Sequence, residues 1–216
     1  MEKKNIIKKK INISDFRRKE QYCFFSEFDI SYYSVTTPIY VRDIVRFGKK
    51  YGISLYGLFT YVLLATNNEM ENFCYRREND CIYKYNIIDA SCTFLQGEDL
   101  QFSNRIVYEK DIKKFMNVFI EKKQEAENGK RKSNLSGNLN IIYLSTLPWF
   151  RLKNVTNVRQ RIKDDTIPRF SWGKIYDNNK WVDMVIEVSH LFVDGYHISL
   201  FIDKIQDKIL KFRKFL

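Results

Sequence analysis

The 216-residue chain contains few of the residues that break or crosslink a fold: three prolines, eight glycines and four cysteines. Its cysteines form no CxxC pair and no metal-ligand spacing, which argues against a zinc site and against a disulfide framework; they are Cys23, Cys74, Cys81 and Cys92. The longest apolar run, residues 55–65, is far shorter than the roughly 20 residues needed to cross a bilayer. We therefore expect neither a metal nor a membrane partner.

The N-terminal ten residues are basic but lack the continuous apolar stretch and small-residue cleavage site of a secretory signal. A cytoplasmic location follows as the expectation. The length suits one domain covering residues 1–216. Hydrophobic residues make up 44% of the chain and aromatics 16%, enough to form a core and to argue against disorder.

The formal net charge is +11, and the basic residues are spread along the whole chain. Such a field attracts anions, so a basic nucleic-acid-binding module is one reading, which would use Lys8–Lys10 with the basic residues at 113, 114 and 130–132. No recognised nucleic-acid motif supports that reading. A Lys-, Ile- and Asn-rich composition is also what mutational bias in coding sequence produces, so the charge alone does not indicate a partner.

Local patterns in the first half predict alternating helices and strands. We expect a helix over residues 14–25 capped by Ser14, and a strand over 30–41 that Pro38 confines to a sheet edge or a bulge. A helix over 42–51 should end at Gly52, and Ser54 should cap a second helix reaching about residue 68. Residues 80–95 are typical of one or two strands.

The second half continues the mixed pattern. An apolar stripe among lysines predicts a surface helix over 109–128, followed by a polar loop over 127–138. Strands are expected over 139–146 and 167–176, and strict alternation over 182–188 predicts a further strand that leads into His190. Helical spacing from residue 196 onward predicts an amphipathic terminal helix. The order of elements indicates a mixed α and β fold without internal repeats.

Both histidines of the chain lie in residues 189–197, where the last strand delivers His190 into a turn containing Asp194 and Gly195. Glycine would let the backbone turn sharply there. Imidazole is also the side chain best suited to exchanging a proton near neutral pH. A histidine at a strand end is more often a hydrogen-bonded structural residue, so this pattern by itself leaves both roles open.

The stretch His190-Leu-Phe-Val-Asp194-Gly195 resembles the HxxxDG signature of a superfamily of acyl-CoA acyltransferases, which includes dihydrolipoamide acyltransferase catalytic domains. The chain is most similar to the chloramphenicol acetyltransferases, with matches at residues 1–4, 13–20 and 147–149 and in the terminal helix. These matches follow family order and span nearly the whole chain. The resemblance implies an α+β fold of that family, a two-layer mixed β-sheet sandwich with helices.

The resemblance also implies a mechanism. His190 would deprotonate a substrate hydroxyl as its oxygen attacks the thioester of acetyl-CoA, by direct transfer and without a metal. Ser145 would donate a hydrogen bond to the oxyanion. Asp194 would pair with Arg18 and, with Gly195, support the turn. The acceptor would be bound by Phe24, Phe25, Phe102, Trp149 and Ser171, and the coenzyme by Lys174. Without the resemblance, Ser145 reads as a strand serine, Arg18 and Lys174 as surface residues and Trp149 as a core aromatic.

The implied partners are other copies of the chain, in a homotrimer whose active sites lie between subunits, and a small-molecule hydroxyl acceptor. Several residues depart from the family pattern: Ser189 replaces a histidine, Val193 replaces a common cysteine, and Ser133, Val155, Asn157 and Arg159 stand where the acceptor pocket is mostly larger or apolar. An unpaired charge at Arg159 would be costly to bury. Chloramphenicol is therefore the leading acceptor, with a different hydroxyl compound or a catalytically dead relative as alternatives.

Overall fold

A six-stranded mixed sheet organises the computed structural model, which describes residues 5–98, 100–129, 139–159 and 165–216. Its strand order is β2-β9-β8-β7-β5-β6, and β7 runs parallel to both of its neighbours while the other pairs are antiparallel. The strands are β2 (Tyr32–Tyr40), β5 (Asp89–Gln96), β6 (Leu100–Ile106), β7 (Ile141–Leu147), β8 (Arg169–Gly173) and β9 (Trp181–Ser189).

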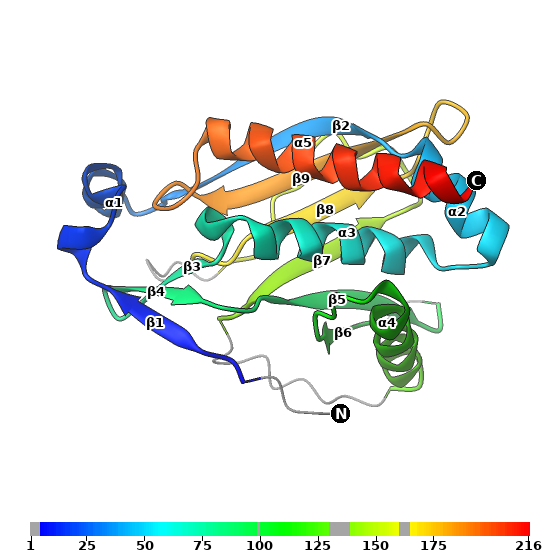
Figure 1. Ribbon diagram of the computed structural model, residues 1–216, viewed down its shortest axis with the longest axis horizontal. Coiled ribbons are helices and arrows are strands. Elements are labelled where there is room, and N and C mark those ends of the chain that lie inside the picture. Colours follow the sequence, from blue (N-terminus) through cyan, green and yellow to red (C-terminus); the bar gives the residue numbers. More distant parts are fainter. Residues whose placement is uncertain (1–4, 99, 130–138, 160–164) are drawn as a thin grey trace.

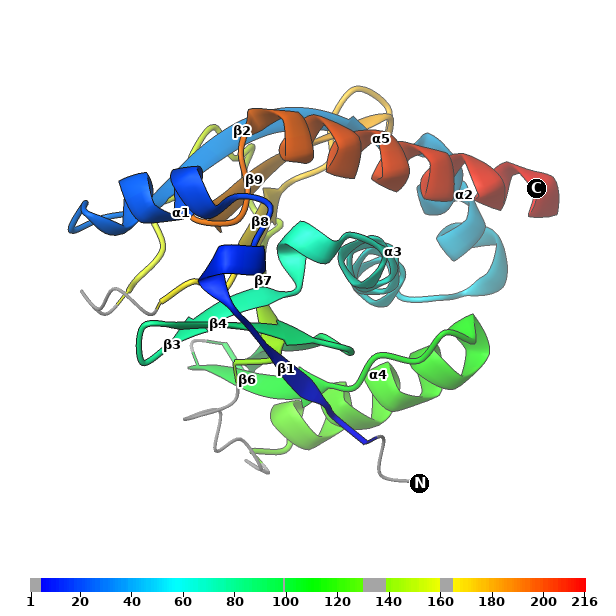
Figure 2. The same cartoon turned by 60° about the vertical axis from the view of Figure 1, so that its left-hand side comes forward.

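Helices α2 to α5 form a second layer against the sheet, and α1 lies apart at one end of it (Figures 1 and 2). Helices α3 and α5 lie side by side across the sheet, and α4 packs against β5 and β6. The helices are α1 (Lys19–Ser26), α2 (Arg42–Tyr51), α3 (Leu55–Glu69), α4 (Ile112–Glu127) and α5 (Gly195–Lys211), with 3₁₀ turns at Ile13–Asp15, Glu71–Phe73 and Phe212–Phe215. The α+β architecture of a mixed sheet with helices is confirmed.

The two faces of the six-stranded sheet differ in chemistry because side chains alternate along each strand. On β9, Val182, Met184, Ile186 and Val188 are fully buried in the core that also contains the apolar side of α5. The intervening residues face the other way, where Asp183, Glu187 and Ser189 are buried although they are polar. We call this second surface the polar face; by strand register it also carries Tyr32, Ser145, Arg169 and Ser171.

A smaller antiparallel sheet, of order β1-β4-β3, lies beside β5 and the start of β7 in the main sheet (Figure 1). It consists of β1 (Lys8–Ile11), β3 (Tyr75–Glu78) and β4 (Cys81–Tyr85). The fully buried guanidinium of Arg76 donates to four backbone carbonyls, those of Phe73, Tyr75, Leu139 and Ile141. Burial lowers the pKa of Arg76 to about 10, and these bonds tie the small sheet to the start of β7.

Most helix boundaries match their local sequence signals. Arg42–Tyr51 ends at Gly52, which adopts φ +65°, and the Ser54 side chain accepts the Gly57 N–H at 3.3 Å to cap α3. Pro38 lies on β2, an edge strand, as its missing N–H requires. Residues 80–95 form two strands, and the helix over 109–128 and the terminal helix are both present.

Other predictions were wrong. Ser14 caps no helix: Asn12 precedes a 3₁₀ turn, and α1 begins only at Lys19. The strand expected over 167–176 is shorter, Arg169–Gly173. Strands β1, β3 and β6 were not predicted, because charged residues interrupt their apolar alternation and sheet pairing alone holds them. Most of the loop predicted over 127–138 lies outside the described residues. In the described ranges, no helix is both long enough and apolar enough to span a bilayer.

Candidate active site

The side chain of His190 lies between two aromatic rings at the end of β9. The Phe25 ring of α1 stacks on the imidazole with centroids 3.9 Å apart and planes 11° apart. On β2, the Tyr33 ring lies 4.5 Å away. The backbone N–H of His190 donates to the Ser31 carbonyl at 2.6 Å. A helix and an edge strand therefore fix both the backbone and the ring plane of this histidine.

Only one ring nitrogen of His190 faces inward. Nδ1 is buried and has no hydrogen-bond partner among the described residues, whereas Nε2 is not a buried atom of this kind. The imidazole therefore presents Nε2 outward from a half-buried position. A fixed ring with a free outward nitrogen has the geometry that a proton-accepting group needs.

Asp194 organises the turn that follows His190. Its carboxylate accepts the Arg18 Nη1–H at 2.7 Å and the backbone N–H of His197 at 3.3 Å, which caps α5. Burial opposes the charged form, but the hydrogen bonds from Arg18 and His197 prevail and hold the pKa of Asp194 below its ordinary value. Asp194 is thus an ionised carboxylate with fixed partners, suited to positioning the turn rather than to moving a proton.

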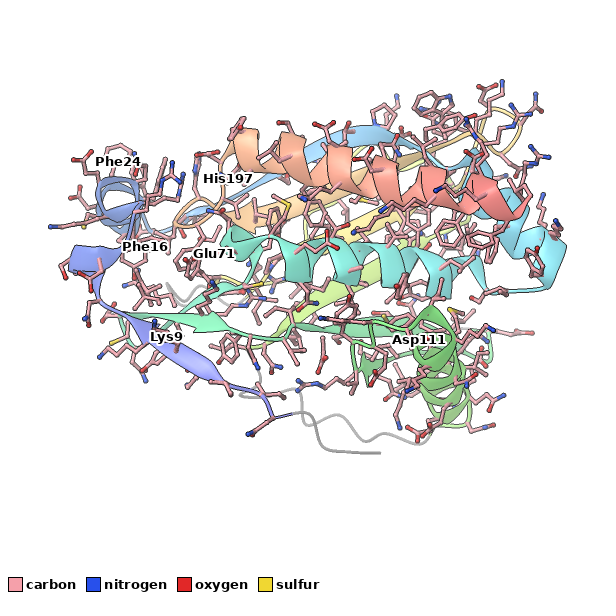
Figure 3. The ribbon with its side chains drawn as sticks, viewed as in Figure 1. Lys9, Phe16, Phe24, Glu71, Asp111 and His197 are labelled. Carbon is pink, nitrogen blue, oxygen red and sulfur yellow. The ribbon has the colours of Figure 1, made fainter. Side chains whose placement is uncertain are left out.

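His197 joins this group, and sequence reasoning did not assign it a role. Its Nδ1 lies 2.7 Å from Asp194 Oδ1 and 3.2 Å from the Asp194 backbone nitrogen. The Asp194 backbone N–H donates to this nitrogen and the His197 N–H donates to the Asp194 carboxylate, so the two residues form a capping box at the start of α5. The capping-box spacing of Asp194 and the third helical residue was the available signal. Figure 3 labels His197 at the start of α5 and Phe24 on neighbouring α1.

Gly195 does not have the role that sequence reasoning gave it. It is the first residue of α5, and it is not among the residues of positive φ in the described chain. A Cβ added there would meet nothing within 4 Å. The turn itself therefore does not require glycine.

Tyr33 is a second residue that the sequence did not single out. Its hydroxyl is buried and has no partner among the described residues. Burial and the nearby Asp194 carboxylate raise the pKa of Tyr33 to about 12, against the opposing effect of Arg18, so the phenol keeps its proton at neutral pH. The only local signal was an aromatic residue on an edge strand opposite Val188.

Ser145 and Ser171 lie far from His190 within one chain. They are paired across β7 and β8, and Ser171 is paired with Val185 on β9. Val185 precedes His190 by five residues, which is about 16 Å along the strand. Ser145 lies two strands away from β9, about 10 Å across the sheet. The distance between Ser145 and His190 is therefore roughly 19 Å. Both serines also belong to the polar face, whereas Tyr33, against which His190 lies, faces the helices with Val188. A single chain therefore does not bring these residues together.

Trp149 and Lys174 lie together where β7 and β8 end. The Lys174 N–H donates to the Phe150 carbonyl at 2.7 Å, and Trp149 is 58% exposed. A Cβ on Gly173 would meet the Leu152 nitrogen at 2.6 Å and the Phe150 carbonyl oxygen at 2.8 Å, so this close backbone approach requires glycine.

The other expected acceptor residues are divided between two regions. Phe24 is exposed and its ring lies 5.1 Å from that of Phe25, beside the histidine. Phe102 lies on β6, at the sheet edge opposite β2, and packs against the core. Ser133 lies outside the described residues.

Arg159 contradicts the expectation of an uncompensated charge. Its Nε donates to Glu187 Oε1 at 2.6 Å, its Nη1 lies 3.0 Å from Asp165 Oδ1, and its side chain is only 3% exposed. The sequence could not show this because Glu187 is 28 residues away and reaches Arg159 only through sheet pairing.

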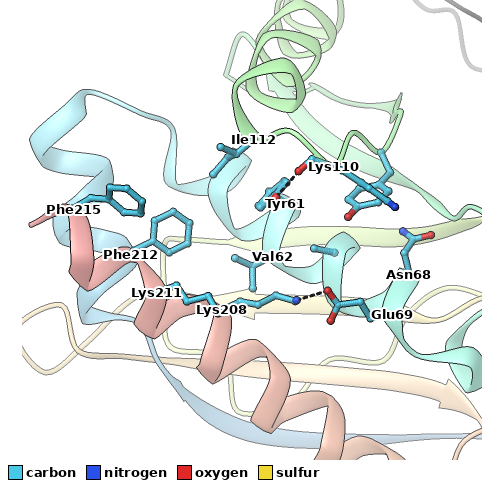
Figure 4. Close-up of a pocket in the computed structure, with 12 residues that line it drawn as sticks. Tyr61, Val62, Asn68, Glu69, Lys110, Ile112, Lys208, Lys211, Phe212 and Phe215 are labelled. Atoms are coloured by element: carbon cyan, nitrogen blue, oxygen red, sulfur yellow. Dashed lines mark hydrogen bonds and ion pairs between the residues drawn. The ribbon is translucent and has the colours of Figure 1, made fainter.

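One cavity of about 570 Å³ lies against α3, the connection into α4 and the end of α5 (Figure 4). Lys208 and Glu69 form an ion pair of 2.6 Å on its wall. Lys208 is thirteen residues beyond Gly195 along α5, about 20 Å from the turn that bears His190. This cavity is therefore separate from the histidine. Among the described residues, no three His, Cys, Asp or Glu side chains are grouped so as to hold a metal ion.

Comparison with known proteins gives a consistent result. A family model described as chloramphenicol acetyltransferase matches residues 7–206. A chloramphenicol acetyltransferase of Clostridium perfringens is 26% identical over 206 residues, covering 91% of this chain and 92% of that protein. One of Clostridium butyricum is 26% identical, covering 95% and 96%. A solved chloramphenicol acetyltransferase superposes with a TM-score of 0.83 at 25% identity, covering 94% of this chain and all of that one.

A more distant structure shows the fold alone. A probable dihydrolipoamide acetyltransferase of Listeria monocytogenes superposes with a TM-score of 0.65 at 17% identity, covering 95% of this chain and 96% of that one.

Proposed function

Because the chain belongs to the chloramphenicol acetyltransferase family of acyltransferases, we propose that it transfers an acetyl group from acetyl-CoA to a substrate hydroxyl in the cytoplasm. His190 is the general base, and the chain acts as one catalytic domain. The observation that carries this proposal is the His190 ring, fixed between Phe25 and Tyr33 with Nε2 outward. Nothing else in the described residues offers a comparably prepared proton acceptor.

The proposed chemistry is one addition and one elimination. His190 Nε2 takes the proton of the acceptor hydroxyl as the oxygen attacks the thioester carbonyl carbon, and the tetrahedral oxyanion accepts a hydrogen bond from Ser145. The carbon–sulfur bond then breaks, and the imidazolium returns the proton to the departing CoA sulfur. The products are an O-acetyl ester and CoA, with no covalent enzyme intermediate.

The site requires two copies of the chain. Ser145 lies roughly 19 Å from His190 by strand geometry, beyond any hydrogen bond to an oxyanion formed at Nε2. We propose a homotrimer in which His190 of one copy meets Ser145 and Ser171 of the next, with Trp149 and Lys174 beside the coenzyme. Phe24, Phe28 and Ile30 support this, because they leave apolar surface exposed near His190.

Chloramphenicol is the leading acceptor, and another hydroxyl compound is the alternative. The relatives named for chloramphenicol are only about one-quarter identical to this chain. Arg159, which lies against Glu187 and Tyr32 of the polar face, adds hydrogen-bond donors that the family resemblance does not imply. No nucleic acid or membrane partner is part of the proposal.

The deciding measurement is a free-thiol assay of purified protein with acetyl-CoA, with and without chloramphenicol. Thiol release that depends on the drug and is lost in His190→Ala supports both the chemistry and the acceptor. Release with other alcohols but not with chloramphenicol would keep the chemistry and replace the acceptor. Absence of release across a panel of hydroxyl compounds would contradict the catalytic proposal.

A further inference from the structure

Arg159 belongs to a buried charged network on the polar face. Its Nε and Nη1 are held by Glu187 and Asp165, and its guanidinium lies over the Tyr32 ring, 4.1 Å from the centroid. Arg169 donates to both carboxylate oxygens of Asp165, at 3.1 and 2.9 Å. Glu187, Asp165 and Tyr32, with Arg169 holding Asp165, thus fix the plane and position of the Arg159 guanidinium.

One donor of this guanidinium is left free. Arg159 Nη2 is buried and has no hydrogen-bond partner among the described residues, although the side chain is only 3% exposed. Asn157 Nδ2, two residues earlier, is also a buried donor without a partner in that part of the chain. Buried donors are nearly always paired in native proteins, so the Arg159 Nη2 donor calls for a partner that the described residues do not supply.

The charge balance of the network limits what that partner can be. Arg159 and Arg169 contribute two positive charges, and Glu187 and Asp165 contribute two negative charges, so the network is formally neutral. A fully charged anion gains no net attraction, whereas an uncharged oxygen acceptor can take the free N–H bonds without bringing an unpaired charge.

The free donors lie close to the residues expected to face the acceptor. Glu187 is paired with Arg169, and Ser171 is two residues further along β8, which makes Ser171 and Glu187 diagonal neighbours about 7–8 Å apart. Ser145 is paired directly with Ser171. Arg159 therefore borders the same part of the polar face as both serines.

We propose that Arg159 Nη2 selects hydroxyl acceptors that carry an uncharged oxygen, such as a carbonyl or nitro group, away from the reacting hydroxyl. This inference rests on the proposed transfer to a hydroxyl compound. It makes Arg159 a specificity-determining residue, not one that moves a proton.

The test is a calorimetric binding titration without acetyl-CoA, using three probes. These are chloramphenicol, its analogue with hydrogen in place of the nitro group, and its analogue with a methylene in place of the amide carbonyl. Wild type should bind one analogue at least about tenfold more weakly than chloramphenicol, because a site built to donate a hydrogen bond rejects a ligand lacking the acceptor.

Arg159→Lys should reduce this discrimination to less than about threefold, because lysine keeps the charge opposite Glu187 but lacks the forked second donor. Arg169→Lys is the matched control: it lies in the same network, but both terminal nitrogens already donate to Asp165. The control should keep the wild-type discrimination.

Three results would overturn the inference. They are equal discrimination in both variants, no loss for either analogue in wild type, and no binding of chloramphenicol by wild type. Dissociation of the oligomer in Arg159→Lys alone would also overturn it, by showing that Nη2 binds another copy. Since no acetyl-CoA is present, discrimination retained without any acetyl transfer in the thiol assay would reject the catalytic proposal and leave only ligand selection by Arg159.

Discussion

A subunit-mixing experiment tests directly whether His190 and Ser145 act across an interface. Each variant alone should transfer acetyl groups far more slowly than wild type. The rate should fall roughly 10²–10⁴-fold in His190→Ala, the usual contribution of a general base, and roughly 10²–10³-fold in Ser145→Ala, the usual contribution of one oxyanion donor. The two side chains are roughly 19 Å apart in one chain. Mixing the variants should therefore restore complete sites.

The expected recovery follows from symmetry. In a ring of three where each site takes His190 from one copy and Ser145 from the next, equal random mixing leaves about one quarter of the sites with both native residues. Differently tagged chains are co-expressed or refolded together, isolated as mixed oligomers, and assayed for thiol release from acetyl-CoA with chloramphenicol or with the hydroxyl compound that supports release in wild type.

A second mixture provides the control. Wild type mixed equally with the double variant should also keep about one quarter of its sites if they lie between copies, but about one half if each site is contained in one chain. Mixed oligomers no more active than the average of the two single variants, with one half retained in the control, would refute the reasoning from strand register.

Three further predictions follow from the described contacts. Asp194→Ala should lower the free energy of unfolding at pH 7 by about 1–2 kcal/mol through loss of the α5 cap and the Arg18 partner. Because the folded pKa of Asp194 is lowered, the stabilisation by its charged form exists above the ordinary carboxyl pKa and disappears as pH falls through the folded pKa. Urea titrations in which the difference from wild type does not shrink on acidification would contradict it. Gly173→Ala should lower the free energy of unfolding by about 1–3 kcal/mol and raise the KM for acetyl-CoA, because the new Cβ meets the Phe150 and Leu152 backbone. Gly195→Ala is the control and should change the free energy of unfolding by less than about 0.5 kcal/mol. Equal losses of stability in the two variants would argue against this account. Arg76→Met should destabilise by more than about 3 kcal/mol in chemical denaturation, since four carbonyls lose their donor, and a near-neutral effect would show that solvent or neighbouring groups replace it.

Much of the architecture was predictable because its signals are local. Gly52 ends α2 and Ser54 caps α3 through atoms within three or four residues. The alternation of residues 182–188 marks β9, since a strand with one apolar face must repeat every second residue. The start of helix α1 was misplaced because its local signal misleads. Ser14 has the residue type of a cap, but the chain forms a 3₁₀ turn after Asn12, and α1 begins at Lys19, next to Arg18, which bonds to the distant Asp194.

The sequence by itself determined the helix ends, the last strand and the turn that carries His190, because each depends on residues close together in the chain. Only the tertiary structure decided that Arg159 is compensated by Glu187 and Asp165, that Tyr33 and Phe25 enclose the imidazole, and that Ser145 lies on the face away from it. These arrangements join residues from different strands and helices, and their partners are selected by sheet register and packing rather than by local sequence.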